Sequence, residues 1–427
     1  MTVLVAQIGA RRHYAVPAAL EQAGLLAGLY TDVCMAAPWW RFLGKAMPGT
    51  LPLPGWKSFR GREPAGVPDE KVTCLWSSLW TMWRIRRLMS QGGQYECWTK
   101  QNEAFGRDVV QRGFGSADCV YAFNGAAIEI FEAARQSGLK CILDMTIAPL
   151  EVVEKLLTEE RERFSHLEIG TQIPNPADTL IARERREWEL ADIILCGSEY
   201  VADSLAAVGV PASKCRVVRW GYTGACAVTP RPQNSGPLRI LIAGTVELRK
   251  GIPYALEAAQ LLSDPRYHFR FVGPIRLDTQ AITERYTNQI TGTTIDFVGP
   301  VPRSEMAREY QNADVLLHPS LAEGSANVCY EAMAHGLPVI ATPNAGAAIT
   351  DGVEGLIIPI RSSAAIASSL RRLANDPALC HSMGQAGRLR ASTLTITEYR
   401  QELSRVIESI SPPQTEPRPL VPPPQKV

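Results

Sequence analysis

Two carboxylates on either side of a helix start are the residues in this sequence best placed to do chemistry. Glu323 lies in a polar loop after an apolar run, and Glu331 follows eight positions later (331 − 323 = 8), about two turns into a helical stretch. A rise of about 1.5 Å per residue puts Glu331 roughly 9 Å along the helix axis from Ser325. Gly324 and Ser325 would let a phosphate reach the free N–H groups and positive dipole end of the helix. An arrangement of this kind could bind a sugar at one end, a diphosphate in the middle and a ribose at the other end.

Two glutamates around a helix start are also typical of a solvated N-terminus. The flanking residues must therefore distinguish a ligand-binding site from a solvated helix end. The stretch from Glu323 to Thr342, EGSANVCYEAMAHGLPVIAT, resembles the donor-sugar signature of glycosyltransferase family 4, with its Glu-x7-Glu pair, EAMA run and G-x-P-V-I turn. The resemblance extends from about Asp192 to the last predicted helix, and more weakly over the N-terminal half. It implies an α/β protein of the GT-B class, with two doubly wound Rossmann-like domains facing across a cleft.

A second signature follows the first strand-like run of the C-terminal half. Lys250 and Gly251 match the family pattern, in which the lysine neutralises the diphosphate of the donor. Thr245 stands where many members carry an arginine, and Arg249 is a candidate for supplying that cation. The alternative is a pair of basic residues that face solvent at a helix start.

By the resemblance, Glu323 binds hydroxyls of the donor sugar and Glu331 binds the ribose. The amides from Gly324 to Ala326 share the diphosphate with the basic residues. The predicted catalytic residues are Glu323, Lys250 and Asp144, and the predicted donor-binding residues are Gly9, Arg249, Lys250, Gly273, Pro274, Glu323, Gly324, Ser325, Ala326, Asn327 and Glu331.

Some of these positions have a simpler interpretation that stays open. Asp144, at a strand end, is expected to contact the acceptor or the donor sugar, but a helix N-cap is the alternative. Gly9 either lets the backbone approach substrate or makes a tight turn. Gly273 and Pro274 either contact the nucleoside or form an ordinary turn. His13 is a site residue or a surface residue, and Ser198 has the position of an N-cap.

Alternating strand-like and helical runs predict two parallel sheets, each covered on both faces. A Pro-rich stretch between the two sheets is typical of a linker, and a Pro-rich tail is typical of a disordered segment. The resemblance implies that the last helix crosses back to the first domain. The predicted organisation is an acceptor-side domain 1–222 with a Trp-rich insertion at 36–100, a linker 223–237, a nucleotide-sugar-binding domain 238–395, a crossover helix 396–410 and a disordered tail 411–427.

Composition narrows the class of protein further. The net charge of +1 gives no reason to expect nucleic-acid binding. No apolar run reaches the ~18 residues of a spanning helix, and the start of the chain lacks a signal-peptide layout, so a cytoplasmic location is expected. The ten cysteines form no C-x-x-C pair, which favours reduced, buried thiols. No D-x-D is present, so neither a metal nor another cofactor is expected.

The Trp-rich segment offers a contact surface. Trp76, Trp80 and Trp83 share one face of a helix, and arginines follow within a turn. Such a face suits the headgroup region at the inner face of the cell membrane, where a lipid-linked acceptor would be reached. A satellite core or a subunit interface is the alternative.

The resemblance implies a metal-independent, retaining glycosyltransferase of the hexosyltransferase type, which moves a sugar from a nucleotide sugar to a glycan or lipid-linked acceptor in cell-envelope glycan or polysaccharide synthesis. Two alternatives stay open: a nucleotide-sugar epimerase of the same fold, and a non-catalytic sugar-nucleotide-binding protein, because Thr245 departs from the pattern. A nicotinamide oxidoreductase is disfavoured, since no G-x-G-x-x-G follows either first strand.

Overall fold

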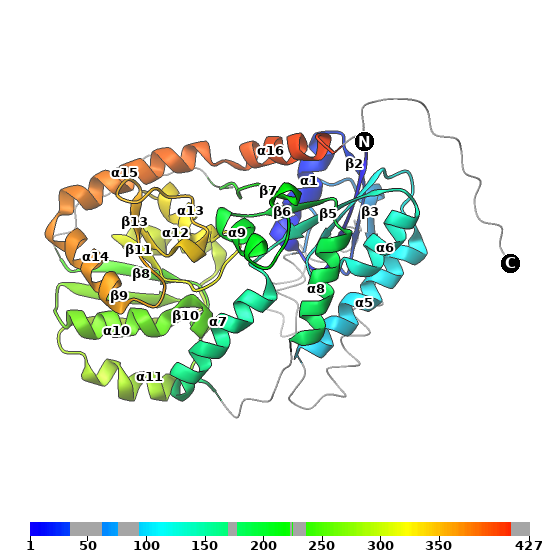
Figure 1. Cartoon of the computed structure of the whole chain (residues 1–427). Coiled ribbons are helices and arrows are strands. Elements are labelled where there is room, and N and C mark those ends of the chain that lie inside the picture. The colour runs from blue at the N-terminus through cyan, green and yellow to red at the C-terminus, as the bar shows by residue number, and fades with distance from the viewer. Residues whose placement is uncertain (35–61, 76–93, 170–176, 223, 225–235, 411–427) are drawn as a thin grey trace, which may run out of the picture.

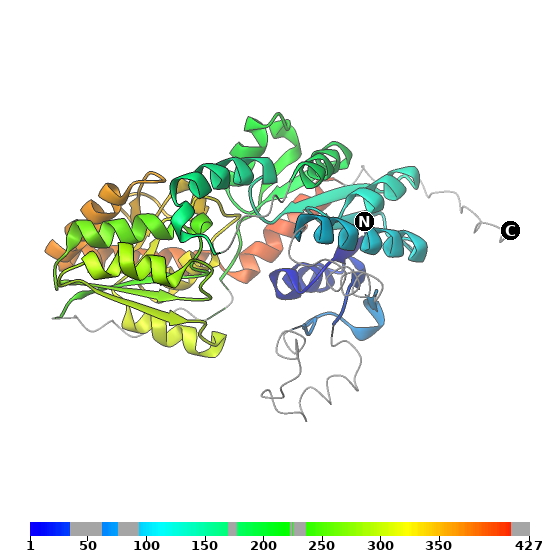
Figure 2. The same cartoon turned by 90° about the horizontal axis from the view of Figure 1, so that it is seen from below.

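The computed structural model describes residues 1–34, 62–75, 94–169, 177–222, 224 and 236–410. Trp76, Trp80 and Trp83, most of the predicted linker and the predicted tail 411–427 lie outside the described residues. Figure 1 shows two α/β units side by side, each built on one sheet, and Figure 2 shows the same units from below. We call them the first and second domains.

The first domain is built on a parallel sheet of seven strands in the order β3-β2-β1-β4-β5-β6-β7. Its strands are β1 Val3–Gln7, β2 Leu26–Thr31, β3 Val72–Cys74, β4 Cys119–Phe123, β5 Lys140–Met145, β6 Ile193–Cys196 and β7 Cys215–Val217. Every residue of β1 and of β4 is buried, as expected for parallel strands covered on both faces. The edge strand β3 comes from within the range 36–100, so that range supplies part of the sheet itself.

The second domain is built on a parallel sheet of six strands in the order β10-β9-β8-β11-β12-β13. Its strands are β8 Leu238–Ala243, β9 Tyr267–Val272, β10 Thr294–Gly299, β11 Val315–His318, β12 Val339–Ala341 and β13 Gly355–Ile357. Strand order reverses between β8 and β11, and in the first sheet between β1 and β4. Such switch points open a crevice at the carboxyl ends of the strands, where ligands bind in doubly wound sheets. Both sheets therefore confirm the predicted doubly wound class.

Helices cover both faces of each sheet (Figure 1). They are α1 Ala15–Gln22, α5 Gln94–Arg112, α6 Ile128–Gln136, α7 Leu150–Arg163, α8 Asp178–Leu190, α9 Glu199–Ala207, α10 Ile252–Leu262, α11 Thr279–Arg285, α12 Arg303–Asn312, α13 Asn327–Ala334, α14 Ser363–Asn375, α15 Pro377–Thr393 and α16 Ile396–Glu408.

Two segments link the domains by packing on the opposite core. The helix α16 lies along α1 (Figure 1), and its Tyr399 and Leu403 share a core cluster with Val3 of the first sheet. In the other direction, Phe164 and Leu167, directly after α7, belong to the core of the second domain. Burying apolar side chains at both ends of these segments fixes how the two carboxyl-terminal sheet edges face each other.

Candidate functional site

The turn after β8 is held against the loop after β11 by one glycine. Gly251 has a φ of +67°, and a Cβ there would stand 2.0 Å from the carbonyl oxygen of Pro319. Only glycine tolerates both the left-handed backbone and the close approach. Gly251 therefore brings Arg249 and Lys250, in the short 3-10 turn Leu248–Lys250, next to Glu323.

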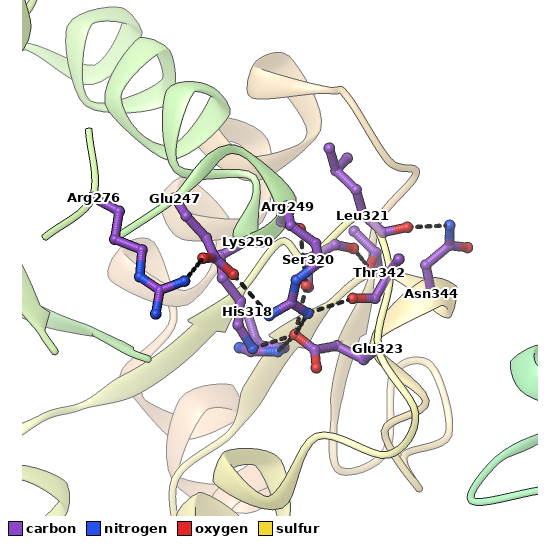
Figure 3. A network of polar contacts seen from close by, with 11 residues as sticks. Glu247, Arg249, Lys250, Arg276, His318, Ser320, Leu321, Glu323, Thr342 and Asn344 are labelled. Carbon is purple, nitrogen blue, oxygen red and sulfur yellow. Dashed lines mark hydrogen bonds and ion pairs between the residues drawn. The ribbon is translucent and has the colours of Figure 1, made fainter. Parts of the chain in front are cut away.

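Glu323 is the centre of a partly buried charge cluster, and the cationic ends of Lys250 and Arg249 both point toward it (Figure 3). Its Oε1 accepts a hydrogen bond from Lys250 Nζ and one of 2.9 Å from Ser320 Oγ, and it lies 3.1 Å from Arg249 Nη1. Burial raises the pKa of the Glu323 carboxyl, but the charge of Lys250, together with His318 and Arg249, outweighs burial and holds that pKa well below its usual range. Glu323 is therefore ionised, with Lys250 and Arg249 as its counterions.

Backbone bonds join the two loops around this cluster. The amide of Leu321 donates to the carbonyl of Arg249 at 2.8 Å, and Arg249 Nη1 donates to the carbonyl of Ala322 at 2.8 Å. Arg249 also pairs with Glu247 at 2.8 Å (Figure 3). Because Arg249 is shared among these acceptors, it is a fixed part of the loop, whereas Lys250 bonds only the carboxylate of Glu323 among the described residues.

His318 is a site residue that sequence reasoning missed. It ends β11 with a side chain 3% exposed, and its Nε2 lies 3.7 Å from Glu323 Oε1, too far for a hydrogen bond. Nε2 has no hydrogen-bond partner among the described residues. Burial lowers the pKa of His318, so the ring is neutral at physiological pH. Its place at the carboxyl end of a strand was the one available signal.

The loop before α13 packs tightly on the first domain. A Cβ on Gly324 would stand 2.1 Å from the carbonyl oxygen of Thr146, and the carbonyl of Gly324 accepts a 2.6 Å hydrogen bond from Ser198 Oγ. Ser198 does precede α9 as expected, but its hydroxyl makes no capping bond. The N-cap interpretation of its side chain is wrong, because the hydroxyl is used between the domains instead.

The amides predicted to hold a diphosphate differ in their surroundings. The amide of Ala326 donates to the carbonyl of Ala345 at 3.1 Å, so it is already satisfied. The hydroxyl of Ser325 bonds the hydroxyl of Tyr330 at 3.0 Å. The helix α13 begins at Asn327, and in its first turn the amide of Cys329 already donates to the carbonyl of Ala326 at 2.9 Å. The end of the helix dipole thus lies beside Glu323, as the spacing predicted.

Glu331 lies about one turn into α13 rather than two, because the helix begins at Asn327. Its Oε2 accepts a 2.6 Å hydrogen bond from the hydroxyl of Tyr310, on α12. Burial, with the charge of Glu331, raises the pKa of Tyr310, which keeps the phenol protonated as a donor. The tyrosine orients the carboxylate that was predicted to bind ribose.

Asp144 is not at the surface of the site. It is the second-last residue of β5, with a side chain 1% exposed, and its Oδ1 accepts from Arg12 Nη2 at 2.9 Å while its Oδ2 accepts from the hydroxyl of Tyr121 at 2.5 Å. The N-cap alternative is wrong, because α7 begins at Leu150 after Pro149. Both oxygens of Asp144 have protein partners, so it reaches a ligand only through Arg12.

The predicted glycines serve the backbone in different ways. Gly9 has a φ of +75°, and its amide donates to Asp32 Oδ1 at 2.9 Å. A Cβ on Gly273 would stand 2.0 Å from the carbonyl oxygen of Gly244, and the carbonyl of Pro274 accepts from the amide of Val246 at 2.8 Å. Gly273 and Pro274 therefore pack on the turn that leads to Lys250.

Two buried glutamates of α8 hold the first-domain loops that face this site. Glu187 accepts from the amides of Gly125 and Ala127 at 2.7 and 2.8 Å, and Glu184 accepts from the amide of Leu150 at 2.7 Å. Burial raises the pKa of Glu184 to about 7 and that of Glu187 to about 8. These carboxyls fix the loops after β4 and β5.

Within the described ranges, no group of three or more His, Cys, Asp or Glu side chains is arranged to hold a metal ion. Among the same residues, no helix is long and apolar enough to cross a membrane. A surface hollow of about 420 Å³ lies between α1 and α16, lined by residues such as Gln22, Arg400 and Ser404. It contains none of the predicted site residues.

Residues 237–376, less than half of the chain, match the family described as glycosyl transferases group 1. The amylovoran biosynthesis glycosyltransferase AmsK of Erwinia amylovora is 28% identical over 230 residues, which are 50% of this chain and 54% of the relative. The putative colanic acid biosynthesis glycosyltransferase WcaL of Escherichia coli is 29% identical over 195 residues, 42% of this chain and 47% of the relative. The chain thus matches about half the length of these relatives.

Two solved structures superpose on nearly the whole chain. Sucrose-phosphate synthase of Thermosynechococcus elongatus has a TM-score of 0.64 at 18% identity, covering 96% of this chain and 99% of that one. HepE of Anabaena, in complex with UDP and glucose, has a TM-score of 0.61 at 14% identity, covering 96% and 100%. At such identities the likeness establishes the fold, which is GT-B. The chain is therefore a GT-B protein whose residues 237–376 match glycosyl transferases group 1, in agreement with the resemblance to glycosyltransferase family 4.

Proposed function

We propose that this chain is a retaining glycosyltransferase that moves a sugar from a nucleoside diphosphate sugar to an acceptor hydroxyl in cell-envelope glycan synthesis. The observation that carries the proposal is the partly buried cluster of Lys250, Arg249 and Glu323 at the carboxyl ends of β8 and β11. The printed names of the relatives, in amylovoran and colanic acid biosynthesis, support the glycan class of product.

The cluster offers complementary partners to both parts of such a donor. Lys250 carries three N–H donors that suit phosphate oxygens, and the N-terminal end of α13 adds a favourable dipole. Glu323 is ionised and accepts hydrogen bonds, as a ligand for sugar hydroxyls must. Without donor, Lys250 and Glu323 neutralise each other, so neither of these partly buried side chains carries an uncompensated charge.

The same groups lie where negative charge would develop during the transfer step. The bond from the anomeric carbon to the diphosphate breaks, and a bond from that carbon to the acceptor oxygen forms on the same face, which retains configuration. The acceptor proton passes to the leaving diphosphate. Lys250 and the α13 dipole stabilise the negative charge that develops on the diphosphate, without a requirement for metal.

The nucleoside end of the donor would lie at Glu331. Its carboxylate is fixed by Tyr310 at 2.6 Å and accepts hydrogen bonds from paired hydroxyls such as those of ribose. The HepE structures with UDP and with UDP-glucose support a nucleotide sugar as the donor class. A glycan or lipid-linked acceptor would be bound from the first domain.

A two-stage experiment tests this function. Thermal unfolding against a panel of nucleoside diphosphates and their sugars identifies the donor, since a ligand at 100 times its Kd adds about 2.7 kcal/mol. The stabilising donor is then incubated with free and lipid-linked saccharide acceptors, and the anomeric proton of the product is followed by NMR. We expect transfer with the donor's anomeric configuration.

Each other outcome contradicts a defined part of the proposal. An inverted product would overturn retention. A donor epimerised at C2 without acceptor would identify an epimerase. Tight donor binding without transfer to any acceptor would favour a binding protein, and no binding in the panel would overturn the nucleotide-sugar assignment altogether.

A further inference from the structure

The loop after β1 holds three consecutive non-glycine residues in the left-handed region. Arg12, His13 and Tyr14 have φ values of +47°, +50° and +60°. Each such residue costs on the order of 1 kcal/mol or more, so a run of three persists only where the surrounding structure imposes it.

Contacts on both sides impose this conformation. Tyr14 is fully buried. Arg12 pairs with Asp144 at 2.9 Å, and its guanidinium lies 5.3 Å from the ring centre of Trp220 and 5.7 Å from that of Tyr399. A buried charge pair with aromatic walls on α16 and beside β7 holds Arg12 firmly. The conformation therefore fixes where the neighbours of Arg12 point.

Arg11, next to this anchor, has no carboxylate partner among the described residues. Its only side-chain hydrogen bond there runs from Nη1 to Thr146 Oγ1 at 3.4 Å. By surface area the side chain is exposed, yet enough protein surrounds it that burial lowers the pKa of its guanidinium, against the opposite effect of Asp144. Arg11 thus remains accessible to solvent while protein groups crowd it, which favours binding an anion.

The contact of Arg11 places it beside the donor loop. The carbonyl oxygen of Thr146 is the atom that a Cβ on Gly324 would meet at 2.1 Å, so Arg11 reaches a residue in direct contact with the loop between Glu323 and α13. On the other side, His13 Nε2 accepts from Arg303 Nη1 of the second domain at 2.7 Å. The loop with Arg11 and His13 therefore spans from the predicted diphosphate end toward α12.

The turn after β8 offers two cations, Arg249 and Lys250, for a diphosphate. Arg249 is committed to Glu247 and to the carbonyl of Ala322, and Thr245 carries no charge. Of the two, Lys250 is then the cation of this turn that faces a group with about two negative charges. A second cation from the opposite side would complete the site.

We propose that Arg11 binds the diphosphate of the nucleotide-sugar donor from the first domain, opposite Lys250. This rests on the proposed function. It also assigns the strained loop a purpose, because the Arg12–Asp144 pair, packed against Tyr399 of α16, fixes the backbone from which Arg11 extends.

Isothermal titration with the nucleoside diphosphate that stabilises the protein tests the proposal. We expect Arg11→Ala to weaken its binding by about tenfold or more, as loss of charge-assisted hydrogen bonds does. The parent nucleoside, without phosphate, should bind both proteins alike. Arg11→Lys should restore part of the diphosphate affinity, since the charge returns without the planar fork. Arg390→Ala, an exposed arginine on α15, is the matched control.

The outcomes separate this proposal from the function on which it rests. If the wild type binds the diphosphate and Arg11→Ala binds it equally, Arg11 is not a phosphate ligand while the donor assignment stands. Equal losses for diphosphate and nucleoside would mean a structural role and would overturn the proposal. If no diphosphate binds the wild type, both fail. Unchanged melting temperatures of the two Arg11 variants exclude unfolding as the cause of lost binding.

Discussion

The hydroxyl of Ser198 donates to the carbonyl of Gly324 across 2.6 Å, joining the start of α9 in the first domain to the loop before α13 in the second. A Cβ on Gly346 would meet the same serine oxygen at 2.6 Å. The predicted donor loop is therefore part of the contact between the domains, so donor binding and domain packing involve the same residues.

Gly324→Ala should disturb this contact. The added methyl would stand 2.1 Å from the carbonyl of Thr146, and overpacking of that kind costs about 1–3 kcal/mol. We expect lower stability in urea and a much lower transfer rate. Ser198→Ala should cost about 1 kcal/mol. Gly28→Ala, whose Cβ meets its nearest atom at 3.4 Å, is the control. Wild-type behaviour of Gly324→Ala would show that the domains are not packed in this way in solution.

Glu323→Gln should abolish transfer and also destabilise the protein. It removes the carboxylate that neutralises Lys250 and Arg249, and losing a hydrogen bond to a charged group costs roughly 1.5–3 kcal/mol. Glu402→Gln, which removes an exposed ion pair, should change neither property measurably. Transfer at a near-normal rate by Glu323→Gln would remove this residue from the site.

Glu331→Ala should mainly raise the KM for the donor. A ribose contact is equally strong in the ground state and the transition state, so kcat should change little. Tyr310→Phe should have the same effect to a smaller extent, because it removes the 2.6 Å bond that orients Glu331. Steady-state kinetics over donor concentration separates the two parameters. A fall in kcat at constant KM would contradict the ribose assignment.

Stability should fall as the pH rises toward 8. The folded pKa values of Glu184 and Glu187, about 7 and about 8, exceed their ordinary value of 4.5. Between those values the folded protein holds more protons than the unfolded chain, so raising the pH disfavours folding. The glutamine amide of Glu187→Gln is uncharged, like the protonated carboxyl, and does not titrate. The free energy of unfolding of this variant should therefore rise relative to that of the wild type as the pH rises from 6 to 8.5. A pH-independent difference between the two proteins in urea unfolding would refute the raised pKa of Glu187.

Activity should survive chelation by EDTA. Lys250 and the dipole of α13 carry the charge of the leaving diphosphate in the proposed mechanism. Transfer rates are compared before and after EDTA treatment, and again with added Mg²⁺ or Mn²⁺. Loss of activity that either ion restores would show that a metal carries this charge instead.

The sequence by itself determined the two sheets and which residues meet on one side of the candidate site. Continuous apolar runs such as β1 and β4 predict strands that are covered on both faces. This prediction needs only the local sequence, because it does not depend on which distant residues cover the strand. Lys250 and Glu323 each follow a strand of the same parallel sheet, and parallel strands place their carboxyl ends at one edge. Their meeting was therefore predictable from local pattern together with the family signature.

Only the tertiary structure decided which residues the first domain contributes to the surroundings of the candidate site. Arg12 bonds Asp144 at a sequence separation of 132 residues, and Ser198 bonds Gly324 at a separation of 126 residues. Local periodicity encodes which faces are buried but not which distant polar groups meet there. Asp144 thus anchors Arg12 instead of facing a ligand. The Ser198 hydroxyl bonds the carbonyl of Gly324 instead of capping α9. The Ser198 contact depends on how α16 and the segment after α7 dock one domain on the other. The Arg12–Asp144 pair instead depends on how the strands of the first sheet are arranged, because both residues belong to that sheet or the loop beside it.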